Sequence, residues 1–305
     1  MKLLITGASG LLGLNLALEA SSAHEVTAVD RNKLAGIPFR VLKADLLEPG
    51  AVDSILDSAG PDWVIHCAAL ADLEACEADP ELARCLNAEL PGELAAACRR
   101  RSISLVHIST DAVFDGQKDG AYREEDEPNA LSVYARTKLA GEKAVMAANP
   151  DAVVARVNFY GWSPSGRRSL AEFFFNNLSA GKSISGFTDV VFCPMLVNDL
   201  AEVLLQMLEK GLSGLYHAVG PQAMSKYQFG VELARKFKLN ENAIAPKSVL
   251  SSTLIAQRAH NLQLSTHKLS TVFGRDLPDF STGLDRFYTQ YQQGYPQEVR
   301  SYQQK

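Results

Sequence analysis

The chain has 305 residues, enough for one large domain or two moderate ones. Apolar residues make up 47% and charged residues 21%, so there is ample apolar surface for folding, and disorder is excluded as the main state. Thirty Lys and Arg against 35 Asp and Glu give a net charge of −5, which argues against general binding to nucleic acid or to an anionic membrane. No apolar run approaches the length of a membrane span.

The N-terminal segment MKLLITGASG runs from a short apolar stretch into Gly and Ser, with no cleavage site. It therefore predicts a first strand and not a signal peptide. The chain has an odd number of cysteines and no CxxC pair, the five being Cys67, Cys76, Cys85, Cys98 and Cys193. We expect reduced thiols and a cytoplasmic protein.

In the first half of the chain, short apolar runs alternate with segments of helical period. The runs predict strands at 2–6, 24–30, 38–46, 61–69, 103–110 and 152–161, and the periodic segments predict helices at 10–21, 51–60, 81–101 and 132–148. Such alternation with short connections predicts right-handed crossovers and a doubly wound parallel (Rossmann) α/β sheet with helices on both faces. We assign residues 1–160 to a dinucleotide-binding domain.

Beyond Gly161 the alternation is less regular. Helices are expected at 169–181, 198–211 and 225–239, the last with Ser225 as its N-cap, and a strand at 213–220. The polar tail at 290–305 is expected to be frayed. We expect residues 190–220 to return to the dinucleotide-binding domain, while 161–189 and 221–305 form a smaller substrate-binding lobe.

Three glycines follow the first strand in the sequence Gly7-Ala-Ser-Gly10-Leu-Leu-Gly13. Gly7 permits a tight turn, Gly10 a close approach of the backbone to a pyrophosphate, and Gly13 close packing of the helix on the sheet. The helix N-terminus then faces the anion. An ordinary strand-to-helix turn would not need three glycines, so we expect a cofactor site formed by Gly7, Ser9, Gly10, Leu11, Leu12 and Gly13.

The end of the second strand bears on which cofactor is bound. Asp30 lies 17 residues beyond Gly13, near the spacing of an acid that binds a ribose 2′-hydroxyl. Arg31 follows at once and can pair with a 2′-phosphate. The balance leans slightly to NAD over NADP, with dual use open, and a plain turn role for Asp30 is the alternative.

Later strand ends add four candidates, with Asp45 and Leu46 framing the adenine and Ala68 and Ala69 lying where a dinucleotide would cross the sheet.

A hydroxyl, a phenol and an ammonium form the candidate catalytic set. Thr110 ends the fifth strand, and Tyr134 and Lys138 share one face of the following helix because they are four residues apart. A free phenol has a pKa of about 10, and a nearby ammonium lowers it towards a range useful for acid–base chemistry. Thr110 can bind a carbonyl oxygen at the strand end, where open α/β sheets place their ligands. The alternative is a solvated Tyr and Lys on a helix surface.

Several motifs resemble one enzyme superfamily. GASGLLG, STDAVFDG and YARTKLAGE resemble the extended short-chain dehydrogenases/reductases, and STDAVFDG is similar to the fifth-strand motif of the dTDP-4-dehydrorhamnose reductases. AYREEDEP and AQRAHNLQLSTHKL also resemble the regulatory β subunits of methionine adenosyltransferase.

The resemblance implies a reductase mechanism. NAD(P)H would deliver a hydride to C4 of a 4-keto-6-deoxy sugar nucleotide, and Tyr134 would donate the proton. Lys138 would tune Tyr134 and orient the ribose, and Thr110 would bind the keto oxygen. Two alternatives stay open: a non-catalytic nucleotide-binding regulatory subunit, and another sugar-nucleotide reductase or epimerase. Dehydratases of the superfamily carry an Asp-Glu pair after the Thr; here Asp111 is followed by Ala112, which disfavours elimination.

The departures from the reductase pattern bear on the sugar. Arg258-Ala-His-Asn261 lacks the proline of the reductase motif Arg-Pro-x-Asn, and Arg156 is followed by Val-Asn-Phe-Tyr-Gly instead of Thr-Ser-Trp. Arg167 and Arg168 can clamp a substrate diphosphate, since Arg pairs bidentately with phosphate. The residues expected to contact the substrate are Asp111, Phe114, Asn158, Arg167 and Arg258.

The remaining features favour simpler interpretations. The histidines are scattered and no spacing predicts a zinc site, so no metal is expected. His66 and His107 are interpreted as satisfied core residues, and the acidic run at 123–128 as a solvated loop. Phe173-Phe174-Phe175 is expected to pack the small lobe, or in part to form a homodimer face. The expected partner is a nucleotide sugar, with neither nucleic acid nor membrane.

Overall fold

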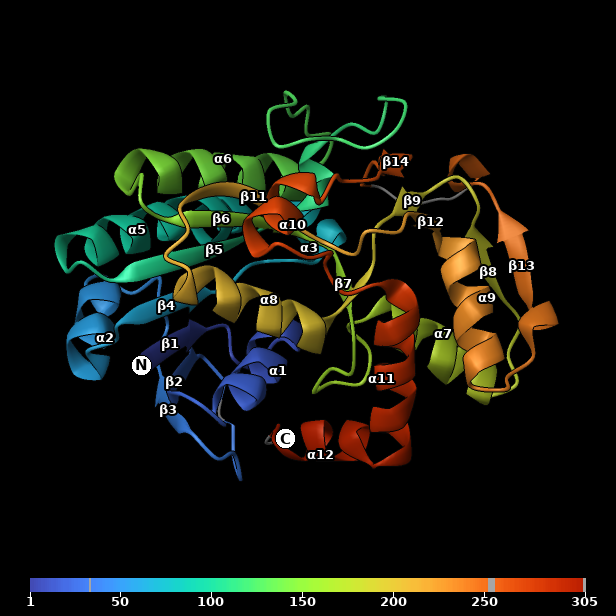
Figure 1. Ribbon diagram of the computed structural model, residues 1–305, viewed down its shortest axis with the longest axis horizontal. Helices are drawn as coiled ribbons and strands as arrows, with labels where there is room; N and C mark the ends of the chain where they lie inside the picture. Colours follow the sequence, from blue (N-terminus) through green and yellow to red (C-terminus); the bar gives the residue numbers. More distant parts are fainter. Residues whose placement is uncertain (33, 252–255, 304–305) are drawn as a thin grey trace.

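Seven parallel strands form the central sheet of the computed structural model, which describes residues 1–32, 34–251 and 256–303. The strand order is β11-β6-β5-β4-β1-β2-β3 (Figure 1). Their bounds are β1 Lys2–Thr6, β2 Glu25–Asp30, β3 Arg40–Lys43, β4 Trp63–His66, β5 Ser104–Thr110, β6 Val153–Val157 and β11 Gly214–Ala218. The central strands are buried on both faces, which is why they are near-continuous apolar runs. The expected doubly wound α/β fold is confirmed.

Helices cover both faces of the sheet. Figure 1 shows α5 and α6 on one side, with α1 and α8 on the other. One apolar core joins the sheet to α1 (Leu11–Ala20), α8 (Val197–Glu209) and α10 (His267–Phe273). A second core joins it to α2 (Ala51–Ala59), α5 (Leu90–Arg100) and α6 (Val133–Ala148). The chain returns to the sheet through α8 and β11, at its edge beside β6.

The segment between β4 and β5 is less regular than the expected single helix. It runs through α3 (Leu73–Ala78), α4 (Pro80–Arg84) and a π-helical turn at Cys85–Glu89 into α5. Pro91 follows the π-helical turn closely and lacks the N–H that would continue its helical hydrogen bonding into α5. The side-chain oxygen of the buried Asn87, in the π turn, accepts a hydrogen bond of 2.9 Å from the Leu70 amide. Its side-chain nitrogen donates to the Leu70 carbonyl at 3.0 Å, so Asn87 fixes the loop after β4.

A smaller lobe lies beside the carboxyl ends of the strands. Its helices are α7 (Leu170–Ser179), α9 (Lys226–Lys236), α11 (Phe280–Gln292) and α12 (Tyr295–Ser301); its strands are β7 (Phe159–Tyr160), β8 (Ile184–Phe187), β9 (Val191–Phe192), β10 (Met195–Leu196), β12 (Met224–Ser225), β13 (Ile244–Lys247) and β14 (Asn261–Leu262). Aromatic side chains fill its core, where Trp162 stacks on Phe287 with ring centroids 4.1 Å apart. Phe174 is buried there, whereas Phe173 is 44% exposed.

The C-terminal tail is ordered, contrary to the expectation of fraying. After α11 the chain forms α12, which buries Pro296 and Val299. The Tyr302 carbonyl then accepts a hydrogen bond of 3.0 Å from the Ala35 amide beside β2. The polar composition of the tail gave no sign of these few contacts. The last two residues of the predicted tail lie outside the described residues.

Two other expectations need correction. His66 and His107 are core residues, but His107 is not satisfied: neither of its ring nitrogens has a partner among the described residues, whereas His66 Nδ1 pairs with Thr6 Oγ1 at 2.7 Å. The acidic loop at 123–128 is anchored to the sheet, because Glu124 accepts a hydrogen bond of 2.9 Å from the His217 amide.

Within the described chain, no helix combines the length and apolarity that crossing a membrane requires.

Candidate active site

Two adjoining cavities open at the carboxyl ends of the parallel strands. The larger, of about 720 Å³, follows the glycine turn and the ends of β2, β3 and β4. The smaller, of about 210 Å³, lies between the end of β5, the start of α6 and the small lobe. Ala71 lines both cavities, so the two lie side by side. This is where open α/β sheets place their ligands.

The glycine turn leaves no room for side chains. Gly7 has φ +70°, and a Cβ there would lie 2.7 Å from the Ala68 amide nitrogen. A Cβ on Gly13 would lie 2.3 Å from the Gly7 carbonyl oxygen, so this glycine packs α1 on the turn itself and not on the sheet as expected. Gly10 is the N-cap of α1 and supplies no side-chain cap, which leaves the first amides of the helix for an anion. Leu11 and Leu12 bury their side chains and can contribute only these amides.

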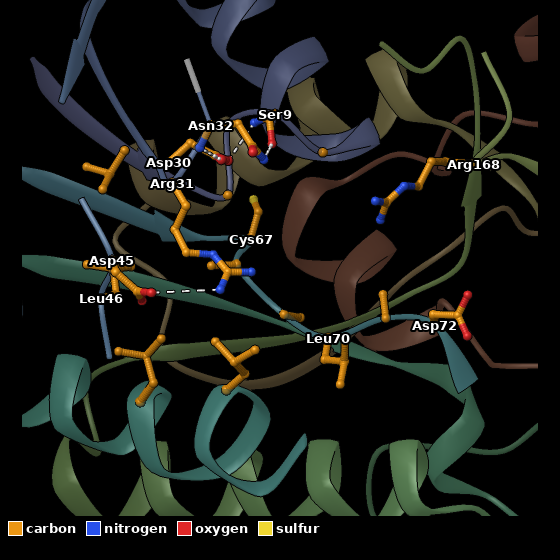
Figure 2. Close-up of a pocket in the computed structure, with 18 of the residues that line it drawn as sticks. Ser9, Asp30, Arg31, Asn32, Asp45, Leu46, Cys67, Leu70, Asp72 and Arg168 are labelled. Carbon is orange, nitrogen blue, oxygen red and sulfur yellow. Dashed lines mark hydrogen bonds and ion pairs between the residues drawn. The ribbon is translucent and has the colours of Figure 1, made fainter. Parts of the chain in front are cut away.

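The carboxylate of Asp30 organises the wall of the larger cavity, as Figure 2 shows. One of its oxygens accepts from the Ser9 amide and the other from the Asn32 amide, both at 2.8 Å. The Asn32 side chain returns a hydrogen bond of 3.1 Å to Ser9 Oγ. Asp30 thus makes the contacts of a turn residue and also lines the groove, while its binding of a ribose hydroxyl stays a prediction.

Cationic side chains flank this groove on two sides (Figure 2). Arg31 extends towards Asp45, with Nη1 3.7 Å from a carboxylate oxygen, and is 61% exposed. Arg167 and Arg168 line the opposite rim. Arg167 was expected at the substrate, but the loop after β7 places it in the lining of the larger groove and not of the smaller pocket. The other expected cofactor residues that line the groove are Gly7, Ser9, Gly10, Leu46, Ala68 and Ala69, whereas the described lining does not include Leu11, Leu12 or Gly13.

The smaller pocket brings together residues from distant parts of the sequence. Its lining includes the expected Thr110, Asp111, Phe114, Tyr134, Asn158 and Arg258, and also Lys226, which the sequence did not indicate. Phe114 is fully buried and stacks on Tyr122 with ring centroids 4.0 Å apart. Ala112 lines the pocket where the dehydratases of the superfamily would carry a glutamate. The described lining of this pocket therefore offers a phenol and a hydroxyl, but not the second acid that elimination needs.

Tyr134 keeps its proton in this setting. Burial raises the pKa of its phenol to about 12, against the opposing effect of a hydrogen bond with Thr110. The sequence had suggested a pKa lowered by Lys138, and this is wrong for the protein without ligands. The lysine ammonium is turned towards a backbone carbonyl, and burial is the dominant effect at the phenol. A protonated phenol is the form that can donate to an alkoxide.

Lys138 is buried within the fold and is not among the described residues that line either cavity. Its Nζ donates to the Ile108 carbonyl at 2.6 Å, and only 3% of the residue is exposed. Burial lowers the pKa of Lys138 to about 8, while the nearby Glu142 and Cys67 hold it up. Both Tyr134 and Lys138 therefore face inward, and the solvated-pair alternative does not describe this helix.

A buried ion pair fixes α6 against the sheet. Arg156 on β6 donates from Nε and Nη2 to the two oxygens of Glu142, at 2.9 and 2.8 Å. Ser109 on β5 donates to the same carboxylate at 2.5 Å. Glu142 lies one turn beyond Lys138 and two turns beyond Tyr134 on the same helix, so this pairing sets the position of the face that carries both.

The fold and these cavities define a dinucleotide-binding α/β protein with a tyrosine-containing ligand pocket beside the dinucleotide groove. The chain belongs to the family described as RmlD substrate binding domain, which matches residues 1–293. The resemblance to the dTDP-4-dehydrorhamnose reductases within the extended short-chain dehydrogenases/reductases is confirmed.

Relatives of two kinds are similar to the chain. The probable low-salt glycan biosynthesis reductase Agl14 of Haloferax volcanii is 36% identical over 75% of this chain and 78% of its own. Methionine adenosyltransferase 2 subunit beta of Mus musculus is 33% identical over 93% of this chain and 86% of its own. Among solved structures, the dTDP-4-dehydrorhamnose reductase of Bacillus anthracis in complex with NADP superposes with a TM-score of 0.85 at 25% identity, covering 95% of this chain and 100% of that one.

Sequence analysis missed three parts of the site. Lys226 belongs to no motif, and only its position after the N-cap Ser225 locates it at a helix start. Asn32 had no signal beyond following Arg31. The Glu142–Arg156 pair could have been suspected, because a Glu eight residues after the Tyr lies on the same helix face. No group of three His, Cys, Asp or Glu side chains able to hold a metal ion occurs in the described ranges.

Proposed function

We propose that the protein is an NAD(P)H-dependent reductase of a 4-keto-6-deoxy sugar nucleotide, of the dTDP-4-dehydrorhamnose reductase type. The observation that carries this is the placement of Thr110 and Tyr134 in a small pocket that adjoins the dinucleotide groove. The groove suits a dinucleotide because its helix N-terminus is uncapped by any side chain and three arginines line it. The names of Agl14 and of the Bacillus anthracis enzyme support a reductase.

The pocket residues would act on the keto group as follows. The bound reduced nicotinamide supplies the hydride to C4. Tyr134 gives its phenolic proton to the oxygen of the former C=O bond, and the pKa of about 12 ensures that the proton is present at neutral pH. Thr110, held in the strand end by the Ala112 amide at 3.2 Å, lies against the same phenol and binds the keto oxygen. The phenolate that remains then recovers a proton from solvent, and Lys138, on the same face of α6, would orient the nicotinamide ribose.

Both nicotinamide cofactors are part of the proposal. Asp30 has lone pairs left for a ribose 2′-hydroxyl after binding two backbone amides. Arg31 is largely exposed, with a single long contact to Asp45, and is free to pair with a 2′-phosphate. The NADP complex of the Bacillus anthracis enzyme supports the second option.

The experiment is an assay of reduced nicotinamide oxidation with purified protein and dTDP-4-dehydrorhamnose. Tyr134→Phe is expected to reduce turnover at least about 100-fold, because it removes the proton donor. Cofactor affinity should be unchanged, and Tyr288→Phe on α11 serves as the matched control. Full turnover by Tyr134→Phe would contradict the mechanism.

A second function is favoured by one observation. The mouse methionine adenosyltransferase subunit is similar over 93% of the chain, more than the reductase Agl14 covers. A non-catalytic nucleotide-binding subunit would bind NAD(P)H, oxidise none of it with any keto sugar, and retain a partner protein on co-purification. Trials with other nucleotide sugars distinguish a reductase or epimerase of different specificity from both.

A further inference from the structure

The C-terminal segment Tyr295–Gln303 has no part in the reaction described above. It consists of α12 and the two residues that follow, and Figure 1 shows α12 near α1 and the β2–β3 connection. Pro296 and Val299 are its buried residues, whereas the others are exposed or half-buried. A helix with so few buried apolar side chains gains little free energy from packing. The contacts at its two ends therefore decide where it lies.

The start of the segment is bonded to α1, the helix whose N-terminus opens on the larger groove. The Tyr295 hydroxyl donates to Asn15 Oδ1 at 2.8 Å. Asn15 is fully buried, and its side-chain nitrogen donates to the carbonyls of Leu11 at 2.7 Å and of Trp162 at 3.0 Å. Tyr295 thus fixes the side chain that joins the first turn of α1 to the chain entering the loop at 163–168.

The last turn of α12 packs against that loop. Arg300 lies directly on the buried Gly166, since a Cβ at this glycine would be 2.7 Å from Arg300 Nε. The neighbours of Gly166, Ser165 and Arg167, both line the larger groove, as does Arg168. Arg300 therefore supports the backbone of one groove wall.

The end of the segment is paired with the opposite wall. The Ala35 amide donates to the Tyr302 carbonyl at 3.0 Å, and Leu34 forms an antiparallel bridge with Gln303. Arg31, on the same β2–β3 connection, lines the groove. The described lining of the groove includes no residue of the C-terminal segment, so the segment acts on a ligand only through the walls that it contacts.

The C-terminal segment and a bound dinucleotide would restrict the same motion. Both join the wall that carries Arg31 to the wall that carries Arg167, the ligand from within the groove and the segment from behind the walls. When two partners order the same parts of a protein, each lowers the entropic cost of the other. Such coupling is reciprocal, so the factor by which the docked segment raises cofactor affinity is also the factor by which the cofactor favours docking.

We propose that Tyr295, Arg300 and Tyr302 are positioning residues for the cofactor. The segment that carries them holds the two walls of the groove together, and its docking and the binding of the dinucleotide favour each other. The inference rests on the proposed function only in taking a nicotinamide dinucleotide as the ligand of the larger groove.

The first test is amide hydrogen exchange of the full chain, measured by mass spectrometry with and without saturating NADPH. Peptides covering 295–303 are expected to exchange about five-fold more slowly with the cofactor, a factor typical of coupled sites. Peptides covering β13, which Figure 1 shows at the outer edge of the small lobe, are the control and should be unchanged. Unchanged exchange at 295–303 under saturating cofactor would overturn the inference.

The second test uses two variants that loosen the segment. Tyr295→Phe removes only the hydroxyl that binds Asn15, and a chain ending at Ser301 lacks the Tyr302 carbonyl that binds the Ala35 amide. Each should weaken NADPH binding roughly five-fold in a fluorescence titration and raise KM for the cofactor more than it lowers kcat. Tyr288→Phe, on α11, is the control and should match wild type.

The outcomes separate the segment from the reaction. A purely structural contact would lower Tm in Tyr295→Phe without changing NADPH affinity, and wild-type affinity in both variants would overturn the inference. Slower exchange at 295–303 with NADPH, but no reduction of any keto sugar, would keep the inference and refute the proposed reductase. Turnover of the keto sugar without this coupling would keep the reductase and refute the inference.

Discussion

The buried ion pair between Glu142 and Arg156 gives the sharpest prediction for a single substitution. Only 2% of the arginine side chain and 7% of the glutamate side chain are exposed. The guanidinium also lies over the Phe114 ring, with Cζ 4.9 Å from its centroid, so it cannot turn to solvent without losing this packing. Glu142→Gln keeps the shape of the side chain but leaves the arginine charge without its counter-charge.

The size of the effect follows from this burial. Removing one member of a buried pair destabilises a protein by about 3–5 kcal/mol, and the lower value suits an amide that still accepts one hydrogen bond. An unfolding entropy of about 2.1 cal/mol/K per residue gives roughly 0.64 kcal/mol/K for 305 residues. A loss of about 3 kcal/mol therefore lowers Tm by about 5 °C.

Thermal unfolding followed by circular dichroism tests this value. Glu209→Gln, at the exposed end of α8, is the control and should shift Tm little. If Glu142→Gln shifts Tm no further than this control, the pair does not hold α6 as described.

The same substitution has a consequence at Lys138. Glu142 is the main group that holds up the pKa of Lys138, which burial lowers to about 8. Without the carboxylate that pKa falls further, so the ammonium is lost at lower pH. The alkaline limb of the kcat–pH profile is expected to move to lower pH in Glu142→Gln. An unchanged limb would show that Glu142 stabilises the fold without affecting the Lys138 ammonium in the reaction.

Three further predictions concern the cofactor groove and the pocket. Gly13→Ala should destabilise the fold by roughly 1–3 kcal/mol, because the added Cβ would lie 2.3 Å from the Gly7 carbonyl oxygen. Gly10→Ala should keep most of the stability, because its Cβ would lie 3.1 Å from the same oxygen. Equal Tm values for the two variants would contradict this packing. Arg31→Ala should weaken NADPH binding roughly ten-fold in a fluorescence titration and leave NADH binding nearly unchanged; equal losses would remove Arg31 from the 2′-phosphate site. Burial raises the pKa of Asp111 from 3.8 to about 6, so the folded state holds an extra proton in this window and the carboxyl destabilises the fold as pH rises through it. The Tm of Asp111→Asn relative to wild type should therefore increase from about pH 4 to about pH 7, and a constant difference would show that this carboxyl is not perturbed.

The sheet and the glycine turn could be predicted from the sequence because local signals determine them. Buried parallel strands are short apolar runs, and the turn needs glycine at positions 7 and 13 for steric reasons that act within a few residues. The spacing of Tyr134 and Lys138 placed them on one helix face for the same local reason.

The charge environment could not be predicted in this way. The pKa of Tyr134 depends on burial under the small lobe, and the direction of the Lys138 ammonium depends on the Ile108 carbonyl of another element. The pairing of β12 with β9 brings Lys226 to the pocket, and no sequence motif predicts this pairing. The C-terminal tail was misjudged because its order rests on a few contacts with the β2–β3 connection and not on composition.

The central claim is that a hydride passes from the nicotinamide groove to a keto carbon held beside Tyr134. Reduced cofactor carrying deuterium at nicotinamide C4 tests it directly when the protein is incubated with dTDP-4-dehydrorhamnose and the product is analysed by NMR and mass spectrometry. The account predicts one deuterium bound to C4 of the product sugar, with no such product from Tyr134→Phe. A product without deuterium at that carbon, or intact substrate beside wild-type protein saturated with cofactor, would contradict it.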